Sequence, residues 1–150
     1  MITRRALLAG TASLTAMGGF ALLARPAFAT AEATDAAIAA FVGGKAPEPG
    51  RITLTAPEIA ENGNSVPVTV EVDSPMTDGD YVASVTILAE GNPNPEVATF
   101  HFTPLSGTAA ATTRIRLAKT QTVVAIAKMS DGSTFSDRKE VKVTIGGCGG

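Results

Sequence analysis

Residues 65–73 alternate strictly between valine and polar or turn-forming residues, and this alternation constrains the fold more than any other feature of the chain. The valines occupy one side of the segment: Val66, Val68, Val70 and Val72. Successive side chains of a β-strand point to opposite faces, so the pattern predicts a strand with one buried and one solvated face. Pro67 lies on the polar side, which places it at a strand start or on an edge strand.

Further segments have strand-like patterns and are separated by clusters of Pro, Gly, Asn and Asp: 51–55, 81–90, 97–103, 112–117, 122–129 and 138–145. Segments 81–90 and 122–129 are apolar on both sides, which predicts central strands that are covered on both faces. In the last segment, Val141, Val143 and Ile145 are expected to face the core. Short strands at this spacing predict an all-β, immunoglobulin-like antiparallel β-sandwich.

One short helix is expected before the strands, over residues 34–42. Thr34 is a suitable N-cap, and the glycines that follow Val42 end the helix. The apolar residues of the segment share one helical face: Ile38, Phe41 and Val42. The sandwich domain, with this short N-terminal helix, is expected to span residues 30–145.

The composition excludes several classes of function. The chain of 150 residues contains one cysteine and one histidine, too few for a zinc or iron–sulfur site, and a single cysteine forms no intrachain disulfide. The net charge is −2 and 17% of the residues are charged, so no surface for nucleic acid is expected. No cofactor motif is present in the sequence, and no cofactor is expected.

Residues 1–29 have the organisation of an export signal. Arg4 and Arg5 precede a moderately apolar run diluted by Gly, Ser and Thr, and a small-x-small cleavage motif ends at Ala29. This pattern is typical of a twin-arginine signal peptide. It predicts cleavage after Ala29, export to the periplasm and no membrane attachment afterwards; an uncleaved membrane anchor is the alternative. Because the pathway carries folded cargo, a partner bound before export is expected.

The chain ends with Gly-Gly-Cys-Gly-Gly at residues 146–150. A lone cysteine is usually a small buried residue, but the glycines around Cys148 provide no side chains that could enclose it. Glycine has the largest backbone entropy, so a flexible carrier arm is expected over residues 146–150. No basic residue adjoins the thiol to activate it, which favours a carrier thiol over a catalytic nucleophile. The glycines of this arm are Gly146, Gly147, Gly149 and Gly150.

Two other groups of residues could carry chemistry. His101, inside segment 97–103, is expected to point away from the neighbouring phenylalanines; no nucleophile motif accompanies it, and its role is open. Asp73, Asp78 and Asp80 surround a turn. They lack the full ligand pattern of a calcium loop, so turn formation explains them and no metal site is predicted.

The C-terminal segment resembles that of the SoxY family, the sulfur-carrier subunits of the bacterial thiosulfate-oxidising Sox system. The similarity covers nearly all of the chain after the signal. The segments that carry it are 57–68, 73–76, 92–95, 98–102, 129–132, 143–145 and 146–150.

The resemblance implies a covalent carrier rather than an enzyme. In the family, the cysteine that corresponds to Cys148 is oxidatively joined to thiosulfate by the haem protein SoxXA. SoxB then removes the terminal sulfone as sulfate, and SoxCD, where present, oxidises the remaining sulfane sulfur. The resemblance also implies a heterodimer with SoxZ, a small β-sandwich protein without a signal of its own.

Two alternatives stay open at this point. A secreted interaction protein could be cross-linked through Cys148, although a cross-link does not require flanking glycines. A thiol enzyme could pair Cys148 with His101 if the tail folded back onto a strand.

Overall fold

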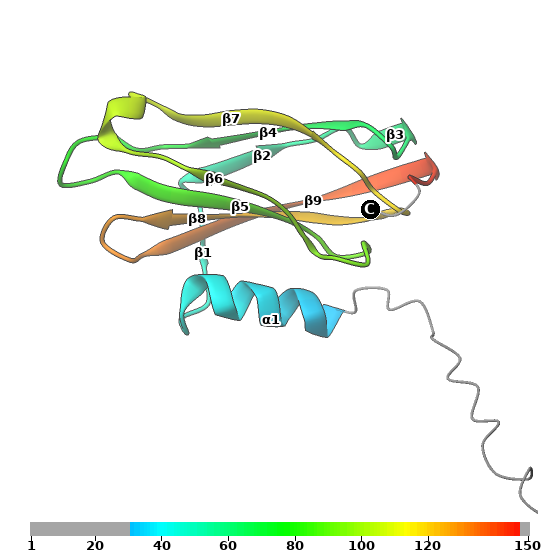
Figure 1. The fold of residues 1–150 in the computed structure, drawn as a ribbon, viewed down its shortest axis with the longest axis horizontal. Helices are drawn as coiled ribbons and strands as arrows, with labels where there is room; N and C mark the ends of the chain where they lie inside the picture. Colours follow the sequence, from blue (N-terminus) through cyan, green and yellow to red (C-terminus); the bar gives the residue numbers. More distant parts are fainter. Residues whose placement is uncertain (1–30, 148–150) are drawn as a thin grey trace, which may run out of the picture.

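The computed structural model describes residues 31–147, which form a two-layer β-sandwich with one helix (Figure 1). The larger sheet has the strand order β1 (Glu48–Pro49), β9 (Thr134–Ile145), β8 (Gln121–Met129), β5 (Val82–Ala89) and β6 (Glu96–His101), and β3 (Ile59–Asn62) also pairs with β9. The smaller sheet contains β2 (Ile52–Thr55), β4 (Val66–Val72) and β7 (Ala109–Ile115). A 3₁₀ turn, η1 (Pro104–Ser106), leads from β6 into β7. The expected all-β sandwich is confirmed.

Two short pairings depart from the antiparallel expectation. Both β1 and β3 run parallel to β9, β1 at its beginning and β3 at its end. Parallel neighbours need a long connection. Here the chain leaves the edge of the larger sheet after β1, adds β2 to the smaller sheet, and returns as β3.

The alternating segment forms β4, and its valines all face the core. β4 is the middle strand of the smaller sheet, so the expectation of an edge strand is wrong, whereas that of a strand start is right. Pro67 pairs with Arg114 of β7, but β2 pairs only with residues 69–72 of β4. The side of β4 next to Pro67 therefore lacks a paired strand, and the missing N–H of proline disrupts no ladder.

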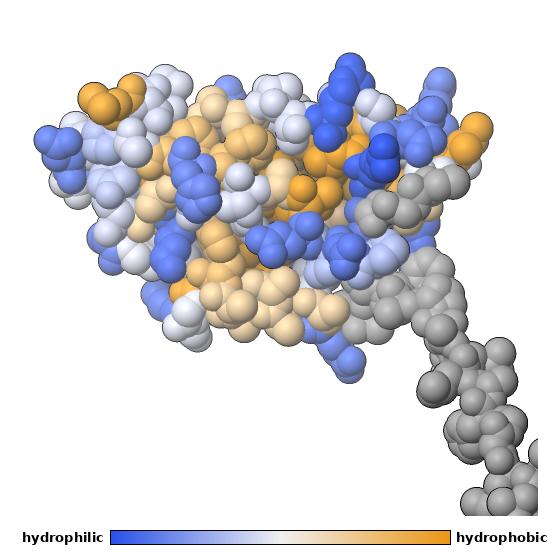
Figure 2. All heavy atoms as spheres, in the orientation of Figure 1, coloured by the Kyte–Doolittle hydropathy of each residue, from blue (hydrophilic) through white to orange (hydrophobic). Residues whose placement is uncertain are grey.

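The central strands β5 and β8 are covered on both faces, as expected. Their inner face packs on the smaller sheet. On the outer face, Leu88, Val124 and Ile126 pack against Ile38 of α1 (Ala31–Val42), which lies across the larger sheet (Figure 1). The helix presents alanines to solvent, so its surface is pale orange in the lower part of Figure 2.

The helix differs from the prediction at its start. Thr34 lies inside α1, where it is buried and its hydroxyl has no hydrogen-bond partner among the described residues, so it is not the N-cap. The preceding Ala-Glu-Ala residues have high helix propensity and continue the helix toward the N-terminus. At the other end, Gly43 and Gly44 have positive φ values of 75° and 125° and end the helix as expected.

The last strand differs from the prediction at its end. Val141 is fully buried and Val143 packs against the core, but Ile145 is 66% exposed. The β8 pairing stops at Val141, and Ile145 pairs only with Asn62 at the end of β3. β9 thus extends past the packed part of the sandwich, where the inward direction no longer faces a core.

Candidate functional site

The described residues stop one residue before the cysteine. Cys148, Gly149 and Gly150 lie outside the described residues, and so do Arg4, Arg5 and the cleavage point after Ala29 within the signal at residues 1–29. The sequence-based expectations for these positions stay predictions. The structure does describe the two glycines that join the cysteine to the sandwich.

Those two glycines belong to the folded body. Gly147 is buried and donates its N–H to the carbonyl oxygen of Leu117 at 2.9 Å. Gly63, in the turn between β3 and β4, accepts a hydrogen bond from the N–H of Leu117 at 2.8 Å and donates one to the carbonyl oxygen of Ile145 at 2.7 Å. The structure therefore differs from the expected arm at its start: Gly147 is hydrogen-bonded to the body, and Gly146 lies close against the carbonyl of Ala118.

We call this junction, formed by Gly63, Leu117, Ala118, Gly146 and Gly147, the tail root. Neither Gly63 nor Gly146 has a positive φ. A Cβ on Gly63 would collide with the carbonyl oxygen of Leu117 and lie 2.8 Å from the nitrogen of Gly147. A Cβ on Gly146 would collide with the carbonyl oxygen of Ala118. These glycines allow close approach of backbones, not free movement.

A buried asparagine fixes the backbone around Leu117, the segment of the tail root that accepts the Gly147 N–H. Asn92, in the loop between β5 and β6, is fully buried. Its Nδ2 donates to the carbonyl oxygen of Arg116 at 2.8 Å, and its Oδ1 accepts from the N–H of Ala118 at 3.0 Å and from Nε2 of Gln121 at 2.9 Å. The two bonds to the backbone flank Leu117, whose N–H and carbonyl both take part in the tail root. Sequence alone does not distinguish Asn92 from Asn94, because each is followed by proline.

His101 lies far from the tail root. It is exposed at the end of β6, opposite Ser84. β6 begins at Glu96, just after the Asn92 loop, and five residue steps of a strand carry the chain about 17 Å away. In Figure 1, the end of β9 lies at the right of the sandwich, and η1, which follows β6, lies at the upper left. Pairing Cys148 with His101 would need the tail to fold back along the sandwich; because Cys148 lies outside the described residues, that alternative stays a hypothesis.

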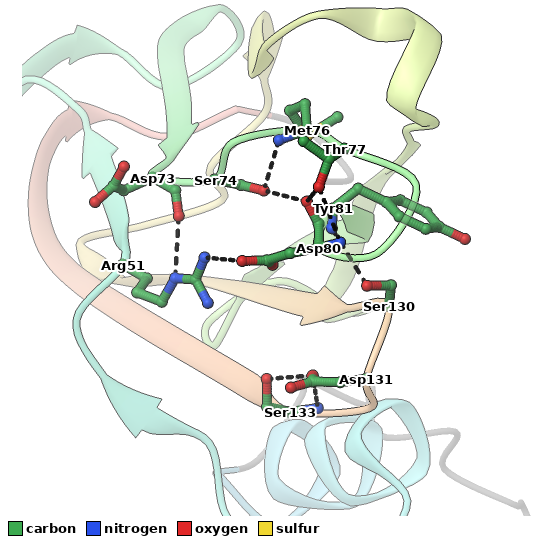
Figure 3. Close-up of polar contacts among 10 residues, drawn as sticks. All are labelled: Arg51, Asp73, Ser74, Met76, Thr77, Asp80, Tyr81, Ser130, Asp131 and Ser133. Carbon is green, nitrogen blue, oxygen red and sulfur yellow. Dashed lines mark hydrogen bonds and ion pairs between the residues drawn. The ribbon is translucent and has the colours of Figure 1, made fainter.

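Two of the aspartates around the turn before β5, Asp73 and Asp80, contact Arg51 (Figure 3). Arg51 Nη2 lies 3.5 Å from the carboxylate of Asp80, and its Nε donates to the backbone carbonyl of Asp73 at 3.0 Å. The carboxylate of Asp73 points away from Asp80 (Figure 3), and Thr77 and Asp80 close the turn through two backbone hydrogen bonds. Over residues 31–147, no group of three or more His, Cys, Asp or Glu side chains could hold a metal ion.

The neighbouring hairpin between β8 and β9 also depends on an aspartate. The N–H and hydroxyl of Ser133 donate to Oδ1 of Asp131 at 2.8 and 2.6 Å (Figure 3). These bonds, the one from the hydroxyl first, hold the pKa of Asp131 below its usual value. Gly132, with a φ of 84°, completes an Asp-Gly turn, a pair of residues typical of hairpins.

Among the described residues, no helix is both long enough and apolar enough to cross a membrane. α1 has only 12 residues, and it is used to cover the larger sheet.

Comparison with known proteins identifies the family. Residues 38–148 match the family model described as sulfur oxidation protein SoxY. The sulfur carrier protein SoxY from Chlorobium limicola f thiosulfatophilum is 37% identical, with a TM-score of 0.63 over 77% of this chain and 100% of that chain. Superoxide reductase (neelaredoxin) from Ignicoccus hospitalis shares the fold, with 21% identity and a TM-score of 0.56 over 77% of this chain and 94% of that one. No curated protein matches. Because the family model covers most of the chain, from α1 to the cysteine, the protein belongs to the SoxY family of sulfur oxidation proteins.

Proposed function

We propose that this protein is an exported carrier that holds thiosulfate-derived sulfur covalently on Cys148 and presents it to the enzymes of a Sox pathway. The observation that carries the proposal is the extent of the family match, which runs through the sandwich and ends at Cys148 itself. The similar protein from Chlorobium limicola f thiosulfatophilum is named a sulfur carrier, and the whole of its length aligns with this chain.

The chemistry needs a thiol that a partner enzyme can reach and an oxidant that the partner supplies. Loading forms one sulfur–sulfur bond: Cys148–SH + S₂O₃²⁻ → Cys148–S–S–SO₃⁻ + H⁺ + 2 e⁻. The two electrons pass to the haem of a SoxXA-type partner. Hydrolysis by a SoxB-type partner then breaks the bond to the sulfone: Cys148–S–S–SO₃⁻ + H₂O → Cys148–S–S⁻ + SO₄²⁻ + 2 H⁺. The carrier supplies the attachment atom, and the enzymes supply catalysis.

The tail fits a carrier because the cysteine follows a fixed point. Gly147 is hydrogen-bonded to the body, and Cys148 is the next residue in the chain. Fully extended, one residue spans at most about 3.3–3.6 Å. A partner enzyme must therefore dock at the end of the sandwich where β9 finishes, and the cysteine enters its catalytic site without the rest of the domain following.

The place of action is part of the same proposal. The arginine pair and the cleavage motif at Ala29 support export to the periplasm by the twin-arginine pathway. Export of folded cargo is consistent with a SoxZ-type subunit travelling in a heterodimer with this chain. SoxXA, SoxB and, where present, SoxCD are transient partners; no cofactor, nucleic acid or membrane attachment is part of the mature carrier.

The test is the mass of the C-terminal peptide. The mature protein is incubated with thiosulfate and a haem-containing oxidising partner, digested, and measured by mass spectrometry without reductant. We expect one added –S–SO₃⁻ group on the peptide that contains Cys148, and loss of that mass on treatment with dithiothreitol. Protein with Cys148→Ser is the matched control and gains no mass.

The same measurement separates a carrier from a cross-linked interaction protein. A carrier gains sulfane or sulfonate adducts in the presence of thiosulfate. If the cysteine were recovered only as a plain disulfide between two copies, with or without thiosulfate, the carrier function would be refuted.

A further inference from the structure

We propose that Gly63 is a positioning residue for the sulfur-carrying cysteine: it closes the tail root so that Cys148 leaves the sandwich from one fixed point. This inference rests on the proposed function. Gly63 lies 85 positions before Cys148 in the chain (148 − 63). The proposal adds it to the residues that determine how the cysteine is presented to a partner enzyme.

The argument starts from the hydrogen bonds of the tail root. Gly63 bonds on one side to the last residue of β9 and on the other to Leu117, and Leu117 in turn accepts the N–H of Gly147. The turn at Gly63, the segment at Leu117 and the C-terminal segment are thus tied together through backbone atoms only. No side chain of the tail takes part, because the tail at this point is glycine.

The contact distances explain why position 63 is a glycine. A Cβ there would collide with the carbonyl oxygen of Leu117, and it would also lie 2.8 Å from the nitrogen of Gly147 and 2.9 Å from Cγ1 of Val143. Two of these neighbours are backbone atoms, which cannot rotate away as a side-chain end could. Alanine at position 63 must therefore displace Leu117, Gly147 or both, which disturbs the hydrogen bond between them.

Loss of the hydrogen bond from the Gly147 N–H to the carbonyl oxygen of Leu117 lengthens the free part of the tail. With Gly147 fixed, one residue, Cys148, separates the thiol from its anchor; with the tail free from Ile145 onward, the separation becomes three residues. The effective concentration of a tethered group falls roughly as the −3/2 power of tether length, so it drops by about five-fold at the site of a docked partner. Reaction with a small dissolved reagent does not depend on docking and does not change.

The experiment compares Gly63→Ala with Gly79→Ala in the full mature chain. Gly79 is a matched control, because a Cβ there meets nothing within 4 Å and its φ is not positive. Three quantities are measured below the melting temperature of each variant: thiosulfate-dependent loading of Cys148 by the oxidising partner, alkylation of Cys148 by iodoacetamide, and hydrogen exchange of the Gly147 amide.

We expect Gly63→Ala to load about five-fold more slowly, to be alkylated at the wild-type rate, and to exchange the Gly147 amide faster, with Gly79→Ala unchanged in all three. Gly146→Ala, whose Cβ would collide with Ala118 from the opposite side, is the second variant and is expected to behave like Gly63→Ala even if the latter does not fold.

Each contrary result has a defined meaning. Unchanged or faster loading, with the Gly147 amide released, refutes the positioning role, and so does an equal loss in Gly79→Ala. Unchanged amide exchange in both tail-root variants refutes the steric argument. Wild-type protein that takes up no sulfur at Cys148 refutes the proposed function, and the positioning role with it, whereas normal wild-type loading with unaffected variants refutes the positioning role alone.

Discussion

Replacing Asn92 with alanine is the most direct test of how the body holds the tail root. Asn92 is fully buried, and its amide makes three hydrogen bonds, two of them to the backbone on either side of Leu117. Alanine keeps the loop but removes all three bonds. It leaves the carbonyl of Arg116 and the N–H of Ala118 without their present partner.

The expected loss of stability follows from the burial of each bond. An unsatisfied buried polar group costs about 1–3 kcal/mol. The bond to Gln121 is buried, but Nε2 of that residue retains a bond to the carbonyl of Lys119 at 3.0 Å. The two bonds to the backbone are partly buried, so water compensates in part and each falls at the low end of the range. We expect Asn92→Ala to lower the free energy of unfolding by about 2–3 kcal/mol.

The assay is urea denaturation followed by circular dichroism. For a domain with a denaturant slope of about 1–3 kcal/mol/M, the midpoint moves down by about 0.7–3 M. Asn94→Ala is the control in the same loop: Asn94 also precedes proline but is exposed, so its replacement changes stability by less than about 0.5 kcal/mol. If both variants had the same midpoint, the claim that the Asn92 amide supports the segment around Leu117 would be wrong.

Three further outcomes are expected. Cys148→Ser abolishes thiosulfate uptake measured by mass spectrometry and changes the free energy of unfolding by no more than a few tenths of a kcal/mol, because the residue lies beyond the tail root; normal uptake would refute the carrier. Ile38→Ala, which removes the side chain that is 8% exposed between α1 and the larger sheet, lowers the free energy of unfolding by about 2 kcal/mol in urea denaturation, and no loss would show that α1 contributes little. Asp131 has a lowered pKa, so its contribution to stability is present above the unfolded-state value of 3.8 and is lost as the pH falls through the folded-state value; the urea midpoints of wild type and Asp131→Ala therefore converge below pH 3.8, and a constant difference would contradict this.

The strands were predictable because their signal is local. Alternation of valines defines the buried face of β4, and runs that are apolar on both sides identify β5 and β8 as covered strands. These patterns follow from the two-residue period of a strand and do not depend on which strand lies opposite. Which strands pair depends on the strand that lies opposite, and a local pattern does not contain that information. The parallel pairings of β1 and β3 with β9 therefore had no signal in the sequence.

The tail root was not predictable for the opposite reason. A run of glycines has high backbone entropy on its own, and that local property predicts a flexible segment. The contacts that hold Gly146 and Gly147 come from residues far away in the sequence, at Gly63 and at residues 117–118. The same glycine that is flexible in an isolated peptide is required where backbones approach closely, and only the structure shows which case applies.

The position of α1 changes the physical argument for a second subunit. Strands that are apolar on both faces suggest that a sandwich of this size leaves apolar surface for a partner to cover. Here the outward side chains of β5 and β8 are Leu88, Val124 and Ile126, which are at most 1% exposed because α1 lies on them. The helix therefore removes the need for a partner on that face. The proposed SoxZ-type subunit therefore does not contact these side chains while α1 is in place, and truncation of α1, rather than loss of the partner, is the change that exposes them. Binding of a hydrophobic dye should be low for the chain that keeps α1, purified without a partner, and should rise when residues 31–42 are deleted. High binding by the chain that keeps α1 would show that the helix does not close this face in solution.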